Sequence, residues 1–566
     1  MGLEVPDFEA PPCARGENSS YRAMIIRRSP WLHCSLAVLF WLAGCSKSEP
    51  KSGLSTSAVS TGQRTVLNFG NGTEPQDIDP QIVTGVPENK IVNALFEGLV
   101  AEGPTGADTV GGVAERWEIS EDGLVYTFFL RTTAKWSNGD PVTAQDFVAS
   151  YRRILTPSLG AEYAYKLHHV VGAEAFNKGE LKDFAQVGLA APDAHTLRVT
   201  LKHRAPFLIE AMKHYSWFPV HTPTVEKFGG LARKGTAWTR PENLVGNGPF
   251  VLKEWRPNQR IVVTRSPTYW DRQQVKLETI NFLPTESIDT EERMFRTGQV
   301  DRTNELPNTK IDTYKRDYAG SYRQDPYFGV YFYRVNVTKA PLNDKRVRRA
   351  LALAIDRESL VRNVTRGGQQ PAYNFCPPSP MFTSQARIDG DLAEAKRLLA
   401  EAGFPAGRGF PKVDILYNTS ENHRAIAEAI QQMWRTRLGV EIGLANQEWK
   451  VYLDSQDTLN YDLCRAGWIA DYTDPNTFMD MWVTGGGNND TGWSNATYDA
   501  LVRTSLAAGS ETERLASYQQ MEAMLADELP IIPIYFYTRV FAVNPKLRFV
   551  PNAIDNRNWK FVEFLP

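Results

Sequence analysis

Short apolar runs recur along the chain and predict β-strands. Four of them are Val125–Leu130, Thr196–Leu201, Arg260–Thr264 and Val413–Tyr417. Each has the length of an ordinary strand, and they are spread over much of the sequence. They indicate sheets in more than one part of the molecule.

Later in the chain the apolar spacing becomes that of amphipathic helices. Over residues 344–356, apolar residues recur at steps of four (Val347, Leu351, Ile355), and Lys and Arg residues lie on the opposite face. Two more helices are predicted over Asp391–Ala402 and Asn422–Leu438, each followed by a glycine that ends it. Strands mixed with such helices indicate an α/β or α+β protein of more than one domain.

The amino-terminal region has the pattern of an export signal. Two arginines follow Met24, Trp31–Leu42 is apolar, and Leu-Ala-Gly precedes Cys45. A basic start, an apolar run of about a dozen residues and small residues before a cleavage point describe a secretory signal. The last four residues are similar to the bacterial lipobox, whose cysteine is lipidated. The alternative is a chance apolar segment that ends in a cysteine.

We therefore expect residues 1–45 to be a signal region that starts at Met24, with Cys45 lipidated. Residues 46–62 are rich in Ser, Lys, Thr and Gly, which predicts a flexible tether. Stable anchoring takes more than one acyl chain, and lipoprotein modification supplies them. The body of the protein is then expected outside the cytoplasm, close to a membrane surface.

Composition narrows the function further. The chain has 566 residues with 63 Lys+Arg against 65 Asp+Glu, so its near-neutral charge argues against a nucleic-acid-binding protein. That length predicts three or four domains. The 14 Trp, 22 Tyr and 27 Phe are many, and such rings fill cores or line clefts that hold ligands of varied shape.

Motifs for catalysis or metal binding are absent from the sequence. It contains no His-Glu-x-x-His, no Gly-x-Ser-x-Gly and no phosphate-binding loop. Its eight His show no metal-ligand spacing. We predict a protein that is not an enzyme and needs no cofactor or metal. Two later cysteines, Cys376 and Cys464, either pair in an oxidising compartment or stay free.

The segment Cys464–Tyr472 is the strongest candidate for a binding site. It alternates like a strand and ends in a carboxylate beside aromatic residues. One interpretation is a core strand followed by an aspartate that caps the next turn. The other is a cleft wall, in which Asp471 receives a ligand ammonium and Gly467 lets a ligand backbone approach closely.

Motifs spread over residues 64–566 settle the choice through a resemblance. In order, they are Asn71–Gln76, Leu95–Leu99, Ala134–Val148, Asn247–Phe250, Ala340–Arg357, Leu416–Ser420, Asn446–Trp449 and Arg465–Tyr472. With these motifs in register, the chain resembles the oligopeptide-binding proteins of bacterial ABC importers, the large peptide and nickel solute-binding family. Each motif alone is weak, but the ordered set is specific.

The resemblance implies an α/β fold of three domains, in which two lobes close over a ligand by hinge motion. The first domain would be discontinuous and comprise residues 63–96, 223–328 and 538–566. The second would be residues 97–222 and the third residues 329–537. An extended peptide would lie between the lobes.

The resemblance also implies which residues bind the peptide. Asp471 falls where the family's carboxylate meets the peptide α-ammonium, and Arg465 and His423 fall where the peptide carboxylate is met. Aromatic residues at matching positions would line side-chain pockets: Trp449, Trp468, Tyr163 and Tyr537. Gly467, and Asn247 of its own motif, complete the predicted set. Acetylation of the peptide amine is then expected to weaken binding at least tenfold, because a lone buried Asp471 would lose its partner.

Some positions depart from the family's pattern. Gly329 and Ile469 stand where some relatives carry a disulfide, and Arg334 replaces a Glu. The second change predicts a weaker preference for basic peptides.

The expected function is that of a lipid-anchored, monomeric binding protein of the periplasm or cell envelope. It would bind oligopeptides and deliver them to the permease and ATPase complex of an ABC importer. Within that class, a murein-peptide receptor is an alternative. A chaperone-like surface lipoprotein of the same fold and an extracellular hydrolase are further alternatives.

Overall fold

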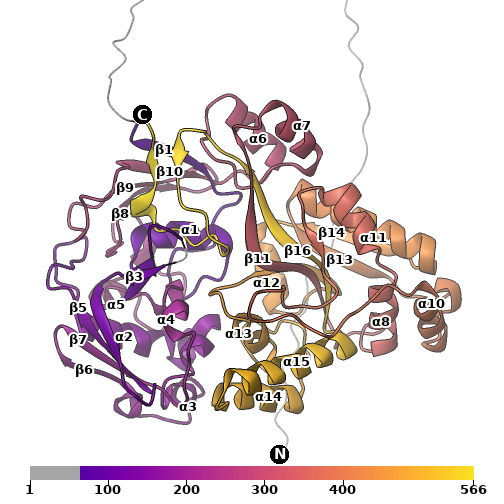
Figure 1. The fold of residues 1–566 in the computed structure, drawn as a ribbon, viewed down its shortest axis with the longest axis horizontal. Coiled ribbons are helices and arrows are strands. Elements are labelled where there is room, and N and C mark those ends of the chain that lie inside the picture. The colour runs from indigo at the N-terminus through magenta and orange to yellow at the C-terminus, as the bar shows by residue number, and fades with distance from the viewer. Residues whose placement is uncertain (1–63, 107) are drawn as a thin grey trace, which may run out of the picture. The chain divides into compact units, whose positions relative to one another are not determined.

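The computed structural model describes residues 64–106 and 108–566, which are drawn in colour in Figure 1. The predicted signal region, Cys45 and nearly all of the tether lie outside the described residues. Among the described helices, none combines the length and the apolar character that a membrane span requires.

The first sheet has four strands in the order β1-β10-β9-β8. They are β1 (Val66–Gly70), β8 (Phe250–Arg256), β9 (Arg260–Arg265) and β10 (Thr279–Leu283). β1 is parallel to β10, and the other pairs are antiparallel. Alternate residues such as Phe69 and Phe282 are buried, and both rings pack edge-on against Trp559 near the end of the chain. The same C-terminal segment contains β17 (Leu547–Arg548) and β18 (Glu563–Phe564), which pair with each other as a two-stranded sheet.

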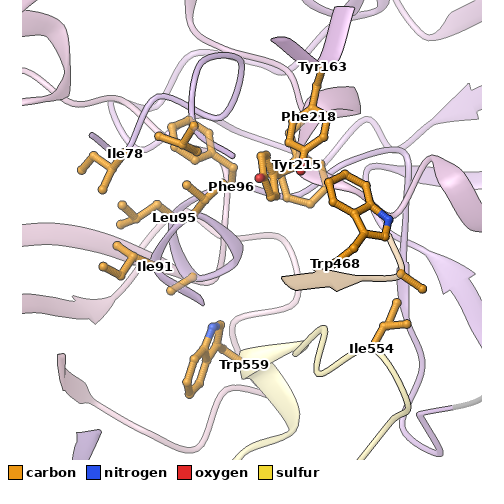
Figure 2. Close-up of a cluster of buried hydrophobic side chains, with 14 of the residues drawn as sticks. Ile78, Ile91, Leu95, Phe96, Tyr163, Tyr215, Phe218, Trp468, Ile554 and Trp559 are labelled. Carbon is orange, nitrogen blue, oxygen red and sulfur yellow. The ribbon is translucent and has the colours of Figure 1, made fainter. Parts of the chain in front are cut away.

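Helix α1 (Val86–Leu95) covers part of this core. Ile91 and Leu95 are fully buried on its inner face, and Phe96 follows directly. Figure 2 shows these side chains gathered together, with Trp559 nearby and Tyr163, Tyr215 and Trp468 on the far side of the cluster. The core beside α1 therefore continues toward aromatic residues that come from distant parts of the chain.

The second part of the fold is built on the sheet β4-β5-β7-β6. Its strands are β4 (Ala114–Ile119), β5 (Val125–Leu130), β6 (Leu189–Asp193) and β7 (Thr196–Thr200), and the hairpin β2 (Val100–Glu102) and β3 (Thr109–Gly111) precedes them. The helices here are α2 (Ala144–Ile154), α3 (Ala173–Asn177), α4 (Leu208–Ala211) and α5 (Thr222–Phe228). Thr143 and Asp146 form a capping box that begins α2. A separate core, with Trp136 and Trp217 fully buried, holds this part together.

The third part has a six-stranded sheet in the order β12-β16-β11-β15-β13-β14. Its strands are β11 (Tyr322–Val335), β12 (Gln370–Pro371), β13 (Val413–Asn418), β14 (Ile442–Gln447), β15 (Leu463–Ile469) and β16 (Ile531–Ala542). The long strands β11 and β16 pair antiparallel along most of their length and run side by side through the ribbon in Figure 1.

Helices complete the third part. They are α6 (Ile288–Arg296), α7 (Ile311–Asp317), α8 (Lys345–Leu353), α9 (Arg357–Leu360), α10 (Leu392–Glu401), α11 (Glu421–Leu438), α12 (Trp449–Asp457), α13 (Asn476–Met479), α14 (Ala496–Ala507) and α15 (Glu511–Glu528), of which α6 and α7 lie between the first sheet and β11 in the sequence. The predicted stop at Gly439 is seen, since this residue closes α11 in the left-handed region.

The mixed α/β fold is confirmed, and the predicted strands and helices are present with ends that differ by at most three residues. The cysteine pair is not: Cys376 and Cys464 are both buried and free. The division into three domains stays a prediction. Two strands cross its boundaries, because β11 runs through residues 328 and 329 and β16 runs through residues 537 and 538.

Candidate ligand cleft

Two adjoining cavities form the candidate cleft. One, of about 140 Å³, contains Asp471 in its wall, and the other, of about 270 Å³, contains His423. We refer to them as the Asp471 end and the His423 end. The residues that line both are Thr84, Gly85, Val86, Tyr327, Trp449, Arg465, Gly467 and Ile469. Because they share so much of their wall, the two cavities are parts of one elongated cleft.

Strand β15 runs along this cleft and has one open edge. β11 pairs with it from Leu463 to Ile469. On the other side, β13 pairs only with Leu463 and Cys464, and no other strand of the described chain pairs with β15. The Arg465 carbonyl accepts a hydrogen bond from the Tyr452 hydroxyl, and beyond it the edge at Gly467–Ile469 has no strand partner and can bond an extended ligand chain.

Asp471 lies just beyond the end of β15, and its carboxylate already has partners. Lys166 Nζ donates to Oδ2 at 2.5 Å, and Thr477 Oγ1 lies 3.3 Å from the same oxygen. His214 Nε2 lies 3.3 Å from Oδ1. The side chains of Lys166 and Asp471 are only 3% and 9% exposed, so the pair is a buried salt bridge. The lone carboxylate expected from the sequence is therefore wrong: Asp471 is matched by a lysine of its own chain.

Aromatic rings surround the same lysine. Its ammonium lies 5.0 Å from the ring centres of Tyr163 and Tyr165, 5.6 Å from Tyr472 and 5.9 Å from Trp468. Each distance is within the range of a cation–π attraction. One carboxylate and four rings therefore form a cage that suits an ammonium group.

His214 completes this end as a neutral side chain. Burial lowers the pKa of His214 to about 3, although Asp471 acts in the opposite direction. The backbone N–H of Ser216 donates to Nδ1 at 3.3 Å, so the ring proton lies on Nε2 and is directed to Asp471. His214 thus supplies a hydrogen bond but no positive charge.

Arg465 stands in the opposite electrostatic situation. Nη1 donates to Asn418 Oδ1 at 3.2 Å and Nη2 donates to the Tyr537 hydroxyl at 2.9 Å. The guanidinium lies 4.9 Å from the ring centre of Tyr331. Burial acts to lower the pKa of Arg465, but the neighbouring tyrosine hydroxyls, Tyr537 first, outweigh it and hold the pKa above its ordinary value. Among the ion pairs of the described residues, none includes Arg465.

His423 lies in the first turn of α11, beside Arg465. Burial and the Arg465 charge together hold the pKa of His423 well below its usual range, so the ring is neutral. Its Nδ1 is buried and has no hydrogen-bond partner in the described chain. Together, Arg465 and His423 offer a charge and a hydrogen-bonding group that are not yet used.

Gly467 lies where the two cavities meet, because it lines both of them. A Cβ atom on this residue would lie 2.6 Å from the Tyr537 hydroxyl, closer than real contacts allow. Trp449 also lines both cavities, and its Nε1 donates to Glu88 Oε1 at 3.2 Å. The glycine therefore keeps the middle of the cleft open for a backbone.

Tyr163 and Trp468 lie at the Asp471 end, as the lining residues show. Their ring centres are 6.4 Å apart, and Figure 2 shows the two side chains on the same side of the buried cluster as Tyr215. Trp468 Nε1 donates to the Thr477 carbonyl at 2.8 Å. Both residues are almost fully buried, so they shape the wall and present little free surface.

Arg334 also lines the Asp471 end, but its charge is already paired with a carboxylate of the same chain. It forms an ion pair with Asp490 and donates to Gln456 Oε1 at 2.6 Å. Three more carboxyl groups line the same cavity: Glu162, Asp457 and Asp555, the last of which is paired with arginines. Burial and the nearby Asp457 raise the pKa of Glu162 to about 8.

Asn247 is not part of the cleft, because it lines neither cavity. Its side chain accepts from the Glu97 N–H at 3.0 Å and donates to the Glu97 carbonyl at 2.8 Å. The flanking glycines Gly246 and Gly248 let the chain pass within contact of the Leu95 backbone at the end of α1. This motif joins two backbone segments, so the structure does not support a ligand contact for Asn247.

The structure adds two residues that the sequence does not reveal, Lys166 and His214. Lys166 sits in a short 3-10 helix (Glu162–Leu167) with no amphipathic period. Its partner Asp471 is 305 residues away in sequence. The only local signal is the row of aromatic residues beside the lysine in Tyr163-Ala-Tyr-Lys166.

A family model described as "Bacterial extracellular solute-binding proteins, family 5 Middle" matches residues 108–490. Among curated proteins, the chain is 38% identical over 500 residues to the periplasmic oligopeptide-binding protein OppA of Salmonella typhimurium, covering 86% of this chain and 90% of that protein.

Two solved proteins are similar in structure. The murein tripeptide binding protein MppA of Escherichia coli superposes with a TM-score of 0.85 at 35% identity, covering 89% of this chain and 99% of that chain. The Haemophilus influenzae OppA complex with the peptide RPPGFSPFR gives 0.84 at 33% identity over the same shares. The unliganded open form of MppA gives only 0.60, at 35% identity and covering 89% and 98%. This chain is therefore closer to a peptide complex than to an open form.

Proposed function

Since the chain belongs to family 5 of the bacterial extracellular solute-binding proteins, we propose that it binds oligopeptides in extended form and delivers them to the permease of an ABC importer. The relatives described above are periplasmic binding proteins and not enzymes, in agreement with the absence of catalytic motifs from this sequence. The periplasm is accordingly the expected compartment.

The open edge of β15 is the observation that carries this proposal. It runs past Gly467 between Arg465 and the region of Asp471, so a ligand main chain can bond to it whatever its side chains are. The six steps from Arg465 to Asp471 span about 20 Å at ~3.3 Å per residue. That length suits a short peptide stretched along the cleft.

The ends of the cleft give the peptide its direction. Arg465 and His423 meet its carboxylate, because Arg465 is a buried charge that forms no ion pair among the described residues and the Nδ1 of the neutral His423 has no hydrogen-bond partner there. The amino end then lies toward Asp471. Trp449, Trp468, Tyr163 and Tyr537 form the walls around the side chains.

The anchor and the partners complete the proposal. We place a lipid on Cys45, with residues 46–62 as the tether, so that a monomeric receptor stays near the membrane. The closed cleft releases its peptide when the lobes open against the permease and ATPase complex.

Peptide binding without cleavage is the first test. The purified full-length chain is denatured, the released small molecules are identified by mass spectrometry, and a library of two- to nine-residue peptides with free and acylated amino ends is then screened by thermal shift. We expect released peptides, an increase in melting temperature by mass action, and intact peptides after incubation. Cleavage products, or no peptide that raises the melting temperature, would contradict the proposal.

Murein peptides are the second candidate ligand. The observation in their favour is the similarity to MppA, whose structure superposes with a TM-score of 0.85. The same screen with murein tripeptide as one member separates the two candidates. Tighter binding of murein tripeptide than of any ordinary tripeptide would favour the murein-peptide receptor.

A further inference from the structure

The Asp471 end of the cleft already contains an ammonium group, that of Lys166. The salt bridge to Asp471 is 2.5 Å long, and both side chains are less than a tenth exposed. Four aromatic rings lie within 6 Å of the lysine nitrogen. A carboxylate inside such a cage is what recognises a cation, and here the chain supplies that cation itself.

A second cation at this place would meet too little negative charge. Apart from Asp471, a buried carboxyl that interacts with Lys166 is that of Asp480, which accepts a hydrogen bond from Asn476 Nδ2 at 3.0 Å. Burial raises the pKa of Asp480 to about 7, so it is only partly ionised at neutral pH. His214 is neutral and donates to Asp471. A free peptide ammonium would therefore have to displace Lys166 into a place with no full counter-charge.

The other end shows the opposite arrangement. Arg465 is a cation with no ion-pair partner in the described chain, and His423 beside it has a free, buried nitrogen. At the Asp471 position the acid is matched by Lys166, whereas Arg465 forms no ion pair among the described residues, although Glu305 lines the same cavity and interacts with its charge. The complementary ligand is an anion at one end and neutral at the other.

We infer that Lys166 is a specificity-determining residue that fills the ammonium position, so that this protein takes peptides with a neutral acyl group on the amino end and a free carboxylate. The inference rests on the proposed function and deepens it. It also reverses the sequence-based expectation that acetylation weakens binding.

Acyl groups reach peptides from more than one source, and the shared chemistry is an amide in place of the ammonium. A formyl group is found on the first methionine of a bacterial chain, and a lactoyl group joins a peptide to a murein sugar. Both remove the positive charge, but the lactoyl group is larger and carries a hydroxyl. Testing both acyl groups on one tripeptide distinguishes the two sources by size.

The test is calorimetric titration of the full-length chain with Ala-Phe-Ala and its N-acetyl, N-formyl and N-lactoyl forms. We expect the acylated forms to bind at least tenfold more tightly than the free amine. Lys166→Met frees Asp471 for the ligand ammonium and should reverse the preference by at least tenfold. Lys178→Met is the matched control, because Lys178 is an exposed lysine on the same part of the chain, paired with Glu174. It should behave as the wild type.

The double variant Lys166→Met/Asp471→Asn guards against a folding defect in the single variant. It buries neither charge, so we expect it to fold and to bind free and acylated peptides within about threefold of each other. A wild-type preference for the free amine, or a preference ratio that Lys166→Met leaves unchanged, would overturn this inference alone. Failure of the wild type to bind any of the four peptides would overturn the proposed function as well.

Discussion

The two ends of the cleft are built from the same kinds of residue but differ in charge balance. At the Asp471 end an acid and a base neutralise one another, with a neutral histidine donating to the acid. At the His423 end, Arg465 stands beside a neutral histidine and forms no ion pair among the described residues, although Glu305 lines the same cavity. The first end is satisfied within the protein, and the second is completed only by a ligand.

This difference separates stability from binding. A buried ion pair that loses one member leaves an unpaired charge, which costs folding free energy. Removing a buried cation that pairs with the ligand lowers the affinity of the protein for that ligand, but it breaks no ion pair within the protein. Substitutions at the Asp471 end should therefore mainly change the free energy of unfolding, and substitutions at the His423 end should mainly change the affinity for the ligand.

The largest effect is expected for the stability of Asp471→Asn without ligand. Lys166 would stay buried with no carboxylate, which costs ~3–5 kcal/mol of unfolding free energy. Urea unfolding measures it. Arg465→Met is the counterpart at the other end and should cost clearly less, because Arg465 forms no ion pair among the described residues and Glu305, which interacts with it, keeps the charge of Arg539. Equal losses at both ends would break the comparison.

Next in size is the effect of Arg465→Met on binding. Replacing the peptide carboxylate by an amide should weaken binding to the wild type by about 2–4 kcal/mol, because the buried guanidinium then stays unpaired. In Arg465→Met the free acid and the amide should bind alike, as titration calorimetry can show. Arg424→Met serves as the control, because Arg424 is an exposed arginine of α11 that pairs with Glu428. A strong preference for the free acid in Arg465→Met would place the carboxylate elsewhere.

The sequence predicts the strand pattern well and the charge balance poorly. Alternation over residues 464–469 predicts β15, and the turn after it places Asp471 at the end of a strand. Such patterns are local, since they depend on which neighbours are apolar. The salt bridge of Asp471 joins residues that are far apart in the chain, and no local pattern pairs them.

Asn247 is a second case in which the sequence locates a motif but does not identify its partner. Its motif of glycine, asparagine, glycine and proline does mark a close approach of two chains. The partner is the backbone near Glu97 and not a ligand, and only the fold decides between these two. A family resemblance predicts where a motif lies in the sequence, but it does not predict which groups that motif contacts in this chain.

A smaller effect is expected at Gly467, where the two ends meet. Gly467→Ala would push the Tyr537 hydroxyl away and disturb its 2.9 Å bond from Arg465. We expect peptide affinity to fall about fivefold to tenfold, or ~1–1.4 kcal/mol, with little change in melting temperature. Gly320→Ala is the control, since nothing lies near an added Cβ there. A melting temperature that falls with the affinity would assign Gly467 to folding instead.

The smallest effect concerns a proton held at the Asp471 end. Burial, with Asp457 and Asp490 nearby, raises the pKa of Glu162 to about 8 in the folded protein, above its ordinary value of 4.5. Between these values the folded state binds more protons than the unfolded state, so this group lowers stability as the pH rises from about 4.5 to about 8. Glu162→Gln removes the titration, so its melting temperature relative to the wild type should increase as the pH rises over this range. Thermal unfolding at pH 5, 6.5 and 8 measures it. A constant difference across the three pH values would show that Glu162 is already ionised, and the Asp471 end would then carry a strong acid in addition to its salt bridge.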